Sequence, residues 1–171
     1  MHSEPRIQTA LEVVDIKNQP LGVFPEKQVH FHGLFHRSVA VAVYDRQSRI
    51  YLRKRNGYQT LYPDRWDLPA SGHVLAGEAV YEAARRKLKE RAGLSLAGLR
   101  LVSLIEGCRE TNCEFIYVFN AGRVRRFPGY GCEDTQIARL NPRDLTRLVQ
   151  ENPETMTPWL VFLWKLELLF R

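Results

Sequence analysis

The sequence contains little cysteine and no paired cysteine motif. Its three cysteines, Cys108, Cys113 and Cys132, are odd in number, and no two of them have the spacing Cys-x-x-Cys. This pattern argues against a zinc or dithiol redox site. We expect three reduced thiols and a cytoplasmic protein.

A long apolar run is also missing. The N-terminal segment MHSEPRIQTA lacks the basic-then-apolar order of a signal peptide. The most apolar segment, WLVFLWKLELLF, contains Lys165 and Glu167 and is about a dozen residues long, too short to span a bilayer. We therefore expect no membrane partner and interpret this segment as a core-packing helix. Its apolar residues with helical spacing are Trp159, Phe162, Leu163, Leu166 and Phe170.

Acidic residues are fewer than basic ones, 19 against 25, which gives a net charge of +6. Such a balance suits an anionic partner, either a phosphate or a nucleic acid. The basic run RVRRF at 123–127 lies close to Tyr130, but no RNA-binding signature accompanies it. We expect a small phosphate-bearing molecule as the partner and no nucleic acid polymer.

The 171 residues, 44% of them apolar, are enough for one domain with its own core, so we expect a single domain over 1–171. One helix is predicted from Glu78 to Ala92, with Gly93 as its C-cap. A second begins near Asn141, with Pro142 at its first position, and a third begins near Glu154. The pattern predicts an α+β fold with a mixed sheet. Strands are predicted at 11–16, 38–44, 49–54, 99–105 and 114–121, with a hairpin turn at the segment DRQS.

The segment 72–94 carries the most specific motif. Its fixed points are Gly72, Glu78, Arg86, Leu88, Glu90, Gly93 and Leu94. With this spacing the segment resembles the Nudix box, G-x5-E-x7-R-E-U-x-E-E-x-G-U, where U is aliphatic. The resemblance implies the Nudix fold, a mixed sheet between α-helices. It also implies a loop and helix whose glutamates hold a divalent metal, Mg²⁺ or Mn²⁺, that activates water against a diphosphate.

The box departs from its pattern where Lys87 and Arg91 replace two of its glutamates. Residues four apart share one face of a helix, so a face that binds metal in the family is basic here. Three interpretations stay open. Both residues are solvated beside a surface ladder of Glu78, Glu82, Arg86 and Glu90; or they bind a phosphate directly, together with Arg55; or a metal is retained at another place.

Histidines support the third interpretation. In the segment VHFHGLFH, His30, His32 and His36 are evenly spaced and would share one face of an extended chain, and His73 lies inside the box loop. Imidazole ligands cluster around metals, so His36 and His73 are the predicted ligands.

Four further segments, FHRSVAVAVYD, PDRWDLPASGHVLAGE, NCEFIYVF and TPWLVF, together resemble type I isopentenyl-diphosphate isomerase, a branch of the Nudix fold. The resemblance implies that His36 and His73 bind metal and that Glu114 both binds metal and moves a proton. It also implies that Trp159 stabilises a carbocation and that Arg55 binds diphosphate.

Several positions depart from the isomerase. Ser71 stands at the catalytic cysteine, Asn112 at a glutamate and Gln59 near a lysine, while Val29 stands at a metal histidine that His30 fills only after a slip of one residue. A hydroxyl is a poorer proton donor and acceptor than a thiol, so Ser71 argues against isomerisation. Asn112 offers a metal only a neutral oxygen, so a bound ion would be held more weakly.

These observations favour hydrolysis of a small diphosphate-linked molecule. An isomerase-like activity and a non-catalytic diphosphate-binding role are the alternatives, and a homodimer stays open. The predicted catalytic residues are Glu90, Glu114 and Ser71; the predicted metal ligands are His36, His73, Glu90 and Glu114; the predicted substrate-binding residues are Arg55, Lys87, Arg91 and Trp159.

Overall fold

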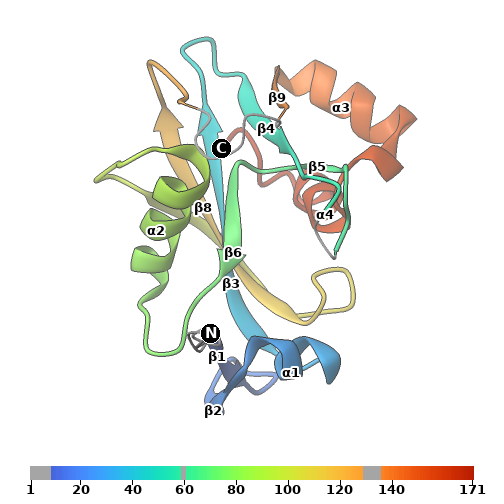
Figure 1. Ribbon diagram of the computed structural model, residues 1–171. Coiled ribbons are helices and arrows are strands. Elements are labelled where there is room, and N and C mark those ends of the chain that lie inside the picture. Colours follow the sequence, from blue (N-terminus) through green and yellow to red (C-terminus); the bar gives the residue numbers. More distant parts are fainter. Residues whose placement is uncertain (1–8, 59–60, 129–135) are drawn as a thin grey trace, which may run out of the picture.

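The computed structural model describes residues 9–58, 61–128 and 136–171, in which nine strands form one mixed sheet. Figure 1 shows this sheet with helices on both sides. Gln59, Tyr130 and Cys132 lie outside the described residues. The strands are β1 (Ala10–Val14), β2 (Pro20–Pro25), β3 (His36–Tyr44), β4 (Ile50–Lys54), β5 (Trp66–Asp67), β6 (Ala70–His73), β7 (Arg100–Ile105), β8 (Glu114–Arg123) and β9 (Ile137–Leu140).

Strand β3 is the centre of the sheet. It pairs in parallel with β8 along one side, from His36 opposite Glu114 onward. On its other side it pairs antiparallel with β1, β6 and β4 in turn. The residues of β3 are almost all buried because strands flank it on both sides and helices cover both faces.

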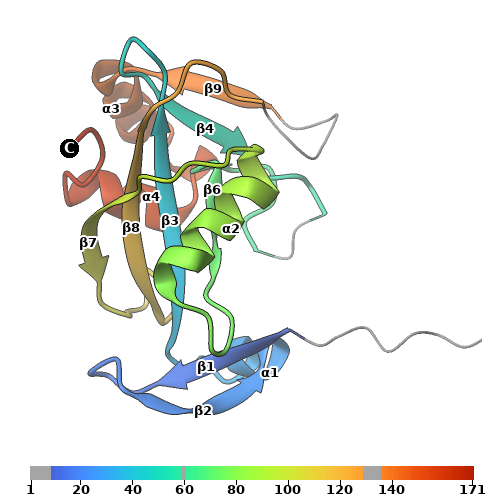
Figure 2. The ribbon, with the colours of Figure 1, turned by 90° about the vertical axis from the view of Figure 1, so that its left-hand side faces the viewer.

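The two faces of β3 alternate between two cores. Val39 and Val41 pack with the buried residues of helix α2 (Val80–Ala92), while Ala40 and Ala42 pack with those of α3 (Pro142–Glu151) and α4 (Pro158–Lys165). Figure 2 shows α2 in front of the sheet, where it lies over β6 and β3. The predicted α+β fold, a mixed sheet between helices, is confirmed.

The N-terminal residues add a smaller unit at one end of the sheet. It consists of the β1–β2 hairpin and helix α1 (Glu26–Phe31), visible at the bottom of Figure 2. A separate core of Leu11, Val13 and Val29 holds α1 on β1. None of the described helices is long and apolar enough to cross a membrane.

Local signals in the sequence account for the helix ends. Helix α2 stops at Gly93, which adopts the left-handed conformation with φ 66°, and helix α3 is capped by the Asn141 side chain, which accepts the backbone N–H of Asp144 at 2.8 Å. The start of α2 was predicted two residues too early, since Glu78 lies in the preceding turn.

The C-terminal helix was predicted too long. A short 3₁₀ turn covers Pro153–Thr155, and α4 ends at Lys165. Beyond it, Glu167 and Phe170 have positive φ values of 54° and 69°, which a helix does not contain. The chain turns back so that Leu168 and Leu169 enter the core, and burial of their side chains outweighs continuation of the helix.

Candidate functional site

Polar side chains interrupt the apolar core at one end of β3, on the face opposite α2. In a strand, residues two apart share a face. His36 and Ser38 therefore lie on the face of Ala40, and the register places Glu114 of β8 opposite His36 and His73 of β6 opposite Ser38. Residues distant in the sequence meet here because β6 and β8 flank the same strand.

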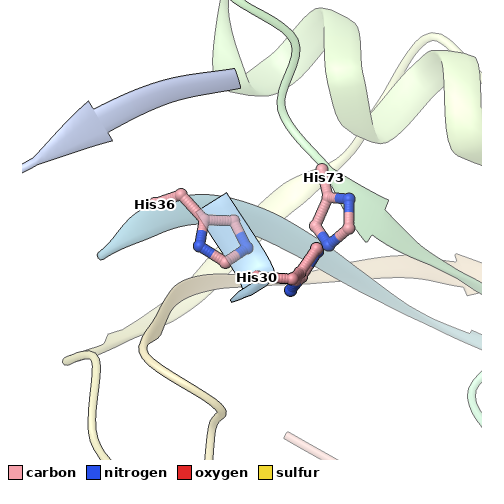
Figure 3. A group of neighbouring side chains, drawn as sticks. All are labelled: His30, His36 and His73. Atoms are coloured by element: carbon pink, nitrogen blue, oxygen red, sulfur yellow. The ribbon is translucent and has the colours of Figure 1, made fainter. Parts of the chain in front are cut away.

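Three histidines gather at this point (Figure 3). One ligand-type nitrogen each from His30, His36 and His73 lies within 4.8 Å of the others, and the ring centroids are 4.8 to 5.0 Å apart. The Glu114 carboxylate lies beside them, 3.8 Å from His73 Nε2 and 4.0 Å from His36 Nε2. The four side chains come from α1, β3, β6 and β8.

The ring nitrogens fit a metal centre. His36 Nδ1 donates to the Leu34 carbonyl at 2.9 Å in the tautomer that leaves its Nε2 with a lone pair. That Nε2 is buried, and so is His30 Nδ1, and neither has a hydrogen-bond partner among the described residues. Unpaired buried polar atoms are costly, and a cation that accepts their lone pairs would remove this cost. Three imidazoles and one carboxylate are a ligand set typical of a divalent transition metal.

The histidines of this cluster have pKa values shifted in opposite directions. Burial lowers the pKa of His36 and of His30, so both favour the neutral form that binds metal. Burial also lowers the pKa of His73, but the neighbouring carboxylates of Glu114 and Glu26 outweigh it and raise that pKa to about 9. The same contact with His73 keeps the pKa of Glu114 below its usual value despite burial, so this carboxylate is ionised at neutral pH.

The predicted extended arrangement of His30, His32 and His36 is wrong. His30 belongs to helix α1, His32 ends that helix, and Gly33 with φ 58° turns the chain into β3. The turn brings His30 back over His36, whereas His32 is exposed. A six-residue helix with no side-chain cap has little local signal, and its stability comes from packing of Val29.

The box helix does not fit a metal. Lys87 is largely buried on the other face of β6, and its Nζ lies 3.2 Å from the Glu90 carboxylate. A Cβ added to Gly72, whose φ is 148°, would lie 2.7 Å from Lys87 Cε, so this lysine packs directly on the glycine backbone. Burial lowers the pKa of Lys87, while the Glu90 carboxylate opposes that shift. An ammonium group thus occupies the space between the box loop and Glu90.

The remaining box carboxylates are also paired. Glu78 accepts two bonds from Arg86, both 2.7 Å, and a third from the backbone N–H of Leu75 at 3.0 Å. Arg86 contacts Glu90 at 3.3 Å and donates to the His73 carbonyl at 3.1 Å. The predicted ladder is correct for Glu78, Arg86 and Glu90, but Glu82 pairs with Arg85 on the exposed surface.

Other predicted site residues lie apart from the rings. Ser71 is in β6 on the same face as His73, two residues earlier in that strand. Trp159, at the start of α4, packs against the core on that face. Arg91 is half-buried on α2, and its charge contributes to the lowered pKa of Lys87. Asn112 is exposed in the loop before β8, with φ 55°.

Arg55 has a structural partner. It donates to the buried Asp67 carboxylate at 3.0 Å and to the Leu61 carbonyl at 2.9 Å, which ties the loop after β4 to β5. Burial of Asp67 raises its pKa to about 6, although Arg55 and the N–H of Leu68 oppose the shift. A role for Arg55 in binding diphosphate stays a prediction.

The raised pKa of Asp67 predicts a pH-dependent stability. The folded state holds this proton more tightly than the unfolded state, so the free energy of unfolding falls as pH rises from about 4 to about 6, by roughly 3 kcal/mol in total. Asp67→Asn should flatten this part of the pH profile of urea unfolding. Asp45→Asn is the matched control, because hydrogen bonds from Arg49 outweigh burial and lower the pKa of Asp45, so its titration falls below this window. An unchanged slope in Asp67→Asn would contradict the assignment.

Comparison with known proteins identifies the family. The family model described as the NUDIX domain matches residues 34–160, and the chain belongs to this family. The uncharacterized Nudix hydrolase PA4841 of Pseudomonas aeruginosa is 33% identical over 87 residues, which cover 51% of this chain and 52% of that protein. The isopentenyl-diphosphate Delta-isomerase of Burkholderia multivorans is 27% identical over 159 residues, which cover 90% of this chain and 89% of that protein.

Solved structures support the fold. The crystal structure of DR0079 from Deinococcus radiodurans has a TM-score of 0.78 at 18% identity and covers 95% of this chain and 99% of that one. The relatives thus include Nudix hydrolases and isopentenyl-diphosphate isomerases, as the sequence motifs predicted. The family match begins at residue 34, so helix α1 and its His30 precede the matched segment.

Proposed function

We propose that this protein is a metal-dependent Nudix enzyme that hydrolyses a small diphosphate-linked molecule, with its metal on the histidine cluster and not on the box helix. The observation that carries the proposal is the convergence of His30, His36 and His73 beside the Glu114 carboxylate, where two buried ring nitrogens have no hydrogen-bond partner in the described part of the chain. Imidazole ligands favour a transition metal such as Zn²⁺ over Mg²⁺, which prefers oxygen ligands, and Mn²⁺ also suits the Glu114 carboxylate.

The chain's own residues supply proton transfer and charge. When bound, a divalent ion supplies positive charge beside the diphosphate and lowers the pKa of nearby water. Glu114 is ionised at neutral pH, so one carboxylate oxygen can accept the proton of the attacking water. The oxygen of that water bonds to one phosphorus, the bond from this phosphorus to the bridging oxygen breaks, and the bridging oxygen leaves on the other phosphate group.

Glu114→Gln should lower the hydrolysis rate by about 10²- to 10⁴-fold, the usual contribution of a general base. The measurement follows ³¹P signals of a nucleoside diphosphate derivative and of isopentenyl diphosphate in the presence of Mn²⁺. Glu106→Gln, in the exposed loop before β8, is the matched control and should leave the rate unchanged. Equal rates in wild type and Glu114→Gln would contradict the role of this carboxylate.

An isomerase-like function is the second candidate, and the near full-length match to an isopentenyl-diphosphate isomerase favours it. Glu114 offers a carboxylate for one proton transfer, while Ser71, the residue predicted for the other transfer, offers only a hydroxyl. A hydroxyl without a base is a poor acid, so we expect isomerisation to be undetectable. The same samples decide between the candidates, since isomerisation changes the ¹H signals of the isoprenoid and releases no phosphate.

A further inference from the structure

A carboxylate that the sequence motifs do not mark lies against the histidine cluster. Glu26, the first residue of helix α1, places its Oε1 3.2 Å from His73 Nδ1. The other nitrogen of the same ring, Nε2, faces Glu114 at 3.8 Å. Glu26 therefore touches the nitrogen of His73 that points away from Glu114.

His36 has an equivalent arrangement. Its Nδ1 is bonded to the Leu34 carbonyl at 2.9 Å, and its Nε2 is left unpaired within the cluster. In both rings an oxygen acceptor engages Nδ1 and leaves Nε2 for a ligand. A metal takes the place of the proton on Nε2, and an acceptor at Nδ1 keeps the remaining proton there, so that the Nε2 lone pair faces the metal.

We propose that Glu26 is a positioning residue for the metal centre: its carboxylate accepts the Nδ1 hydrogen of His73 and so fixes the ring orientation and the tautomer that presents Nε2. The inference rests on the proposed metal site and goes beyond it, because Glu26 acts through His73. Carboxylates in this position hold ligand histidines in other metal sites, and their loss typically lowers metal affinity by about 10- to 100-fold.

Helix α1 makes this arrangement possible. Glu26 and His30 are four residues apart, which places both side chains on one side of a helical turn. Val29 anchors the helix in the small N-terminal core with Leu11 and Val13. One short helix thus brings both a candidate ligand and the support for a second ligand, and it lies outside the segment matched by the family model.

The test compares Glu26→Ala with Glu26→Gln in the full chain. We expect Glu26→Ala to lower Mn²⁺ affinity, measured by calorimetry on chelator-stripped protein, by about 10- to 100-fold and to shift the ligand-field bands of bound Co²⁺. Glu26→Gln should recover most of the affinity, because its amide oxygen still accepts the Nδ1 hydrogen. Glu12→Gln removes a carboxylate from the same N-terminal unit, where it pairs with Arg37 and no histidine, and should leave the affinity unchanged.

Each outcome is decisive. Equal Mn²⁺ affinity in wild type and Glu26→Ala overturns the positioning role while leaving the metal site intact. Equal losses in Glu26→Ala and Glu26→Gln, or a loss in Glu12→Gln of the same size, also overturn it, because the effect would then come from charge. If the wild-type protein binds neither Mn²⁺ nor Co²⁺, the proposed function fails and the inference fails with it.

Discussion

Replacing His73 with alanine is expected to lower Mn²⁺ affinity by more than about a hundredfold, since removal of a direct ligand should cost more than the 10- to 100-fold typical of an outer-shell partner. His73 links the cluster to two carboxylates, Glu26 and Glu114. It also holds one of the three ligand nitrogens within 4.8 Å of one another. Calorimetry on chelator-stripped protein measures the effect directly.

His32→Ala is the matched control for this experiment. His32 undergoes the same chemical change only two residues from His30, but it is exposed at the end of α1 and outside the cluster. We expect its Mn²⁺ affinity to equal that of wild type. Should His73→Ala fold poorly, His30→Ala removes another ring of the same cluster from a short surface helix. Retained affinity in both cluster variants would rule out a metal centre at this position.

Local signals in the sequence predicted three of the described α-helices and five of the nine described strands, while β2, β5, β6 and β9 were missed. The box helix and its Gly93 cap, the Asn141-Pro142 start of α3 and the strands rich in β-branched residues all have short-range causes. Helix α1 was missed because its six residues carry no cap and depend on the burial of Val29. The end of α4 was missed because the positive φ of Glu167 is stabilised by packing of the residues that follow it, and this packing cannot be read from the local sequence.

The residues of the candidate site also fall into two groups, those that the sequence could indicate and those that depend on tertiary packing. His36, His73 and Glu114 could be grouped because they match positions in a known family, and the sheet register brings them together. His30 fits a metal position of that family only after a slip of one residue, and Glu26 fits none, because the place of both depends on how α1 returns over β3. A glutamate four residues before a histidine, as in EKQVH, is the signal that was available, although it is common on helix surfaces.

The structure also places the histidine cluster and the box helix apart, which the sequence could not do. Alternation along β6 directs His73 to one face of the sheet and leaves the backbone of Gly72 against Lys87 on the other. We therefore expect the histidine cluster to hold a metal whatever happens on the box helix. Loss of the box glutamates would then remove one proposed metal position without removing the other.

This separation leads to the last prediction. Lys87→Glu together with Arg91→Glu should create a Mg²⁺ site on the box helix that is absent from the wild-type protein. The ammonium of Lys87 lies 3.2 Å from the Glu90 carboxylate. Lys87→Glu puts carboxylate oxygens, which are the ligands that Mg²⁺ prefers, in place of this ammonium. Without Mg²⁺ the variant should be less stable than wild type, because carboxylates then lie close to Glu90 with no cation between them.

Thermal unfolding with and without Mg²⁺ measures how much the ion stabilises the double variant. At a hundred times its Kd, the ion should stabilise the double variant by about 2.7 kcal/mol, whereas wild type should respond little. Lys87→Gln with Arg91→Gln is the matched control: it removes both cations but adds no charged ligand, so it should show no comparable response. The response should also survive when His73→Ala is added, because the two positions lie on opposite faces of β6. A double variant that Mg²⁺ does not stabilise would mean that Lys87 and Arg91 do not occupy a former metal position.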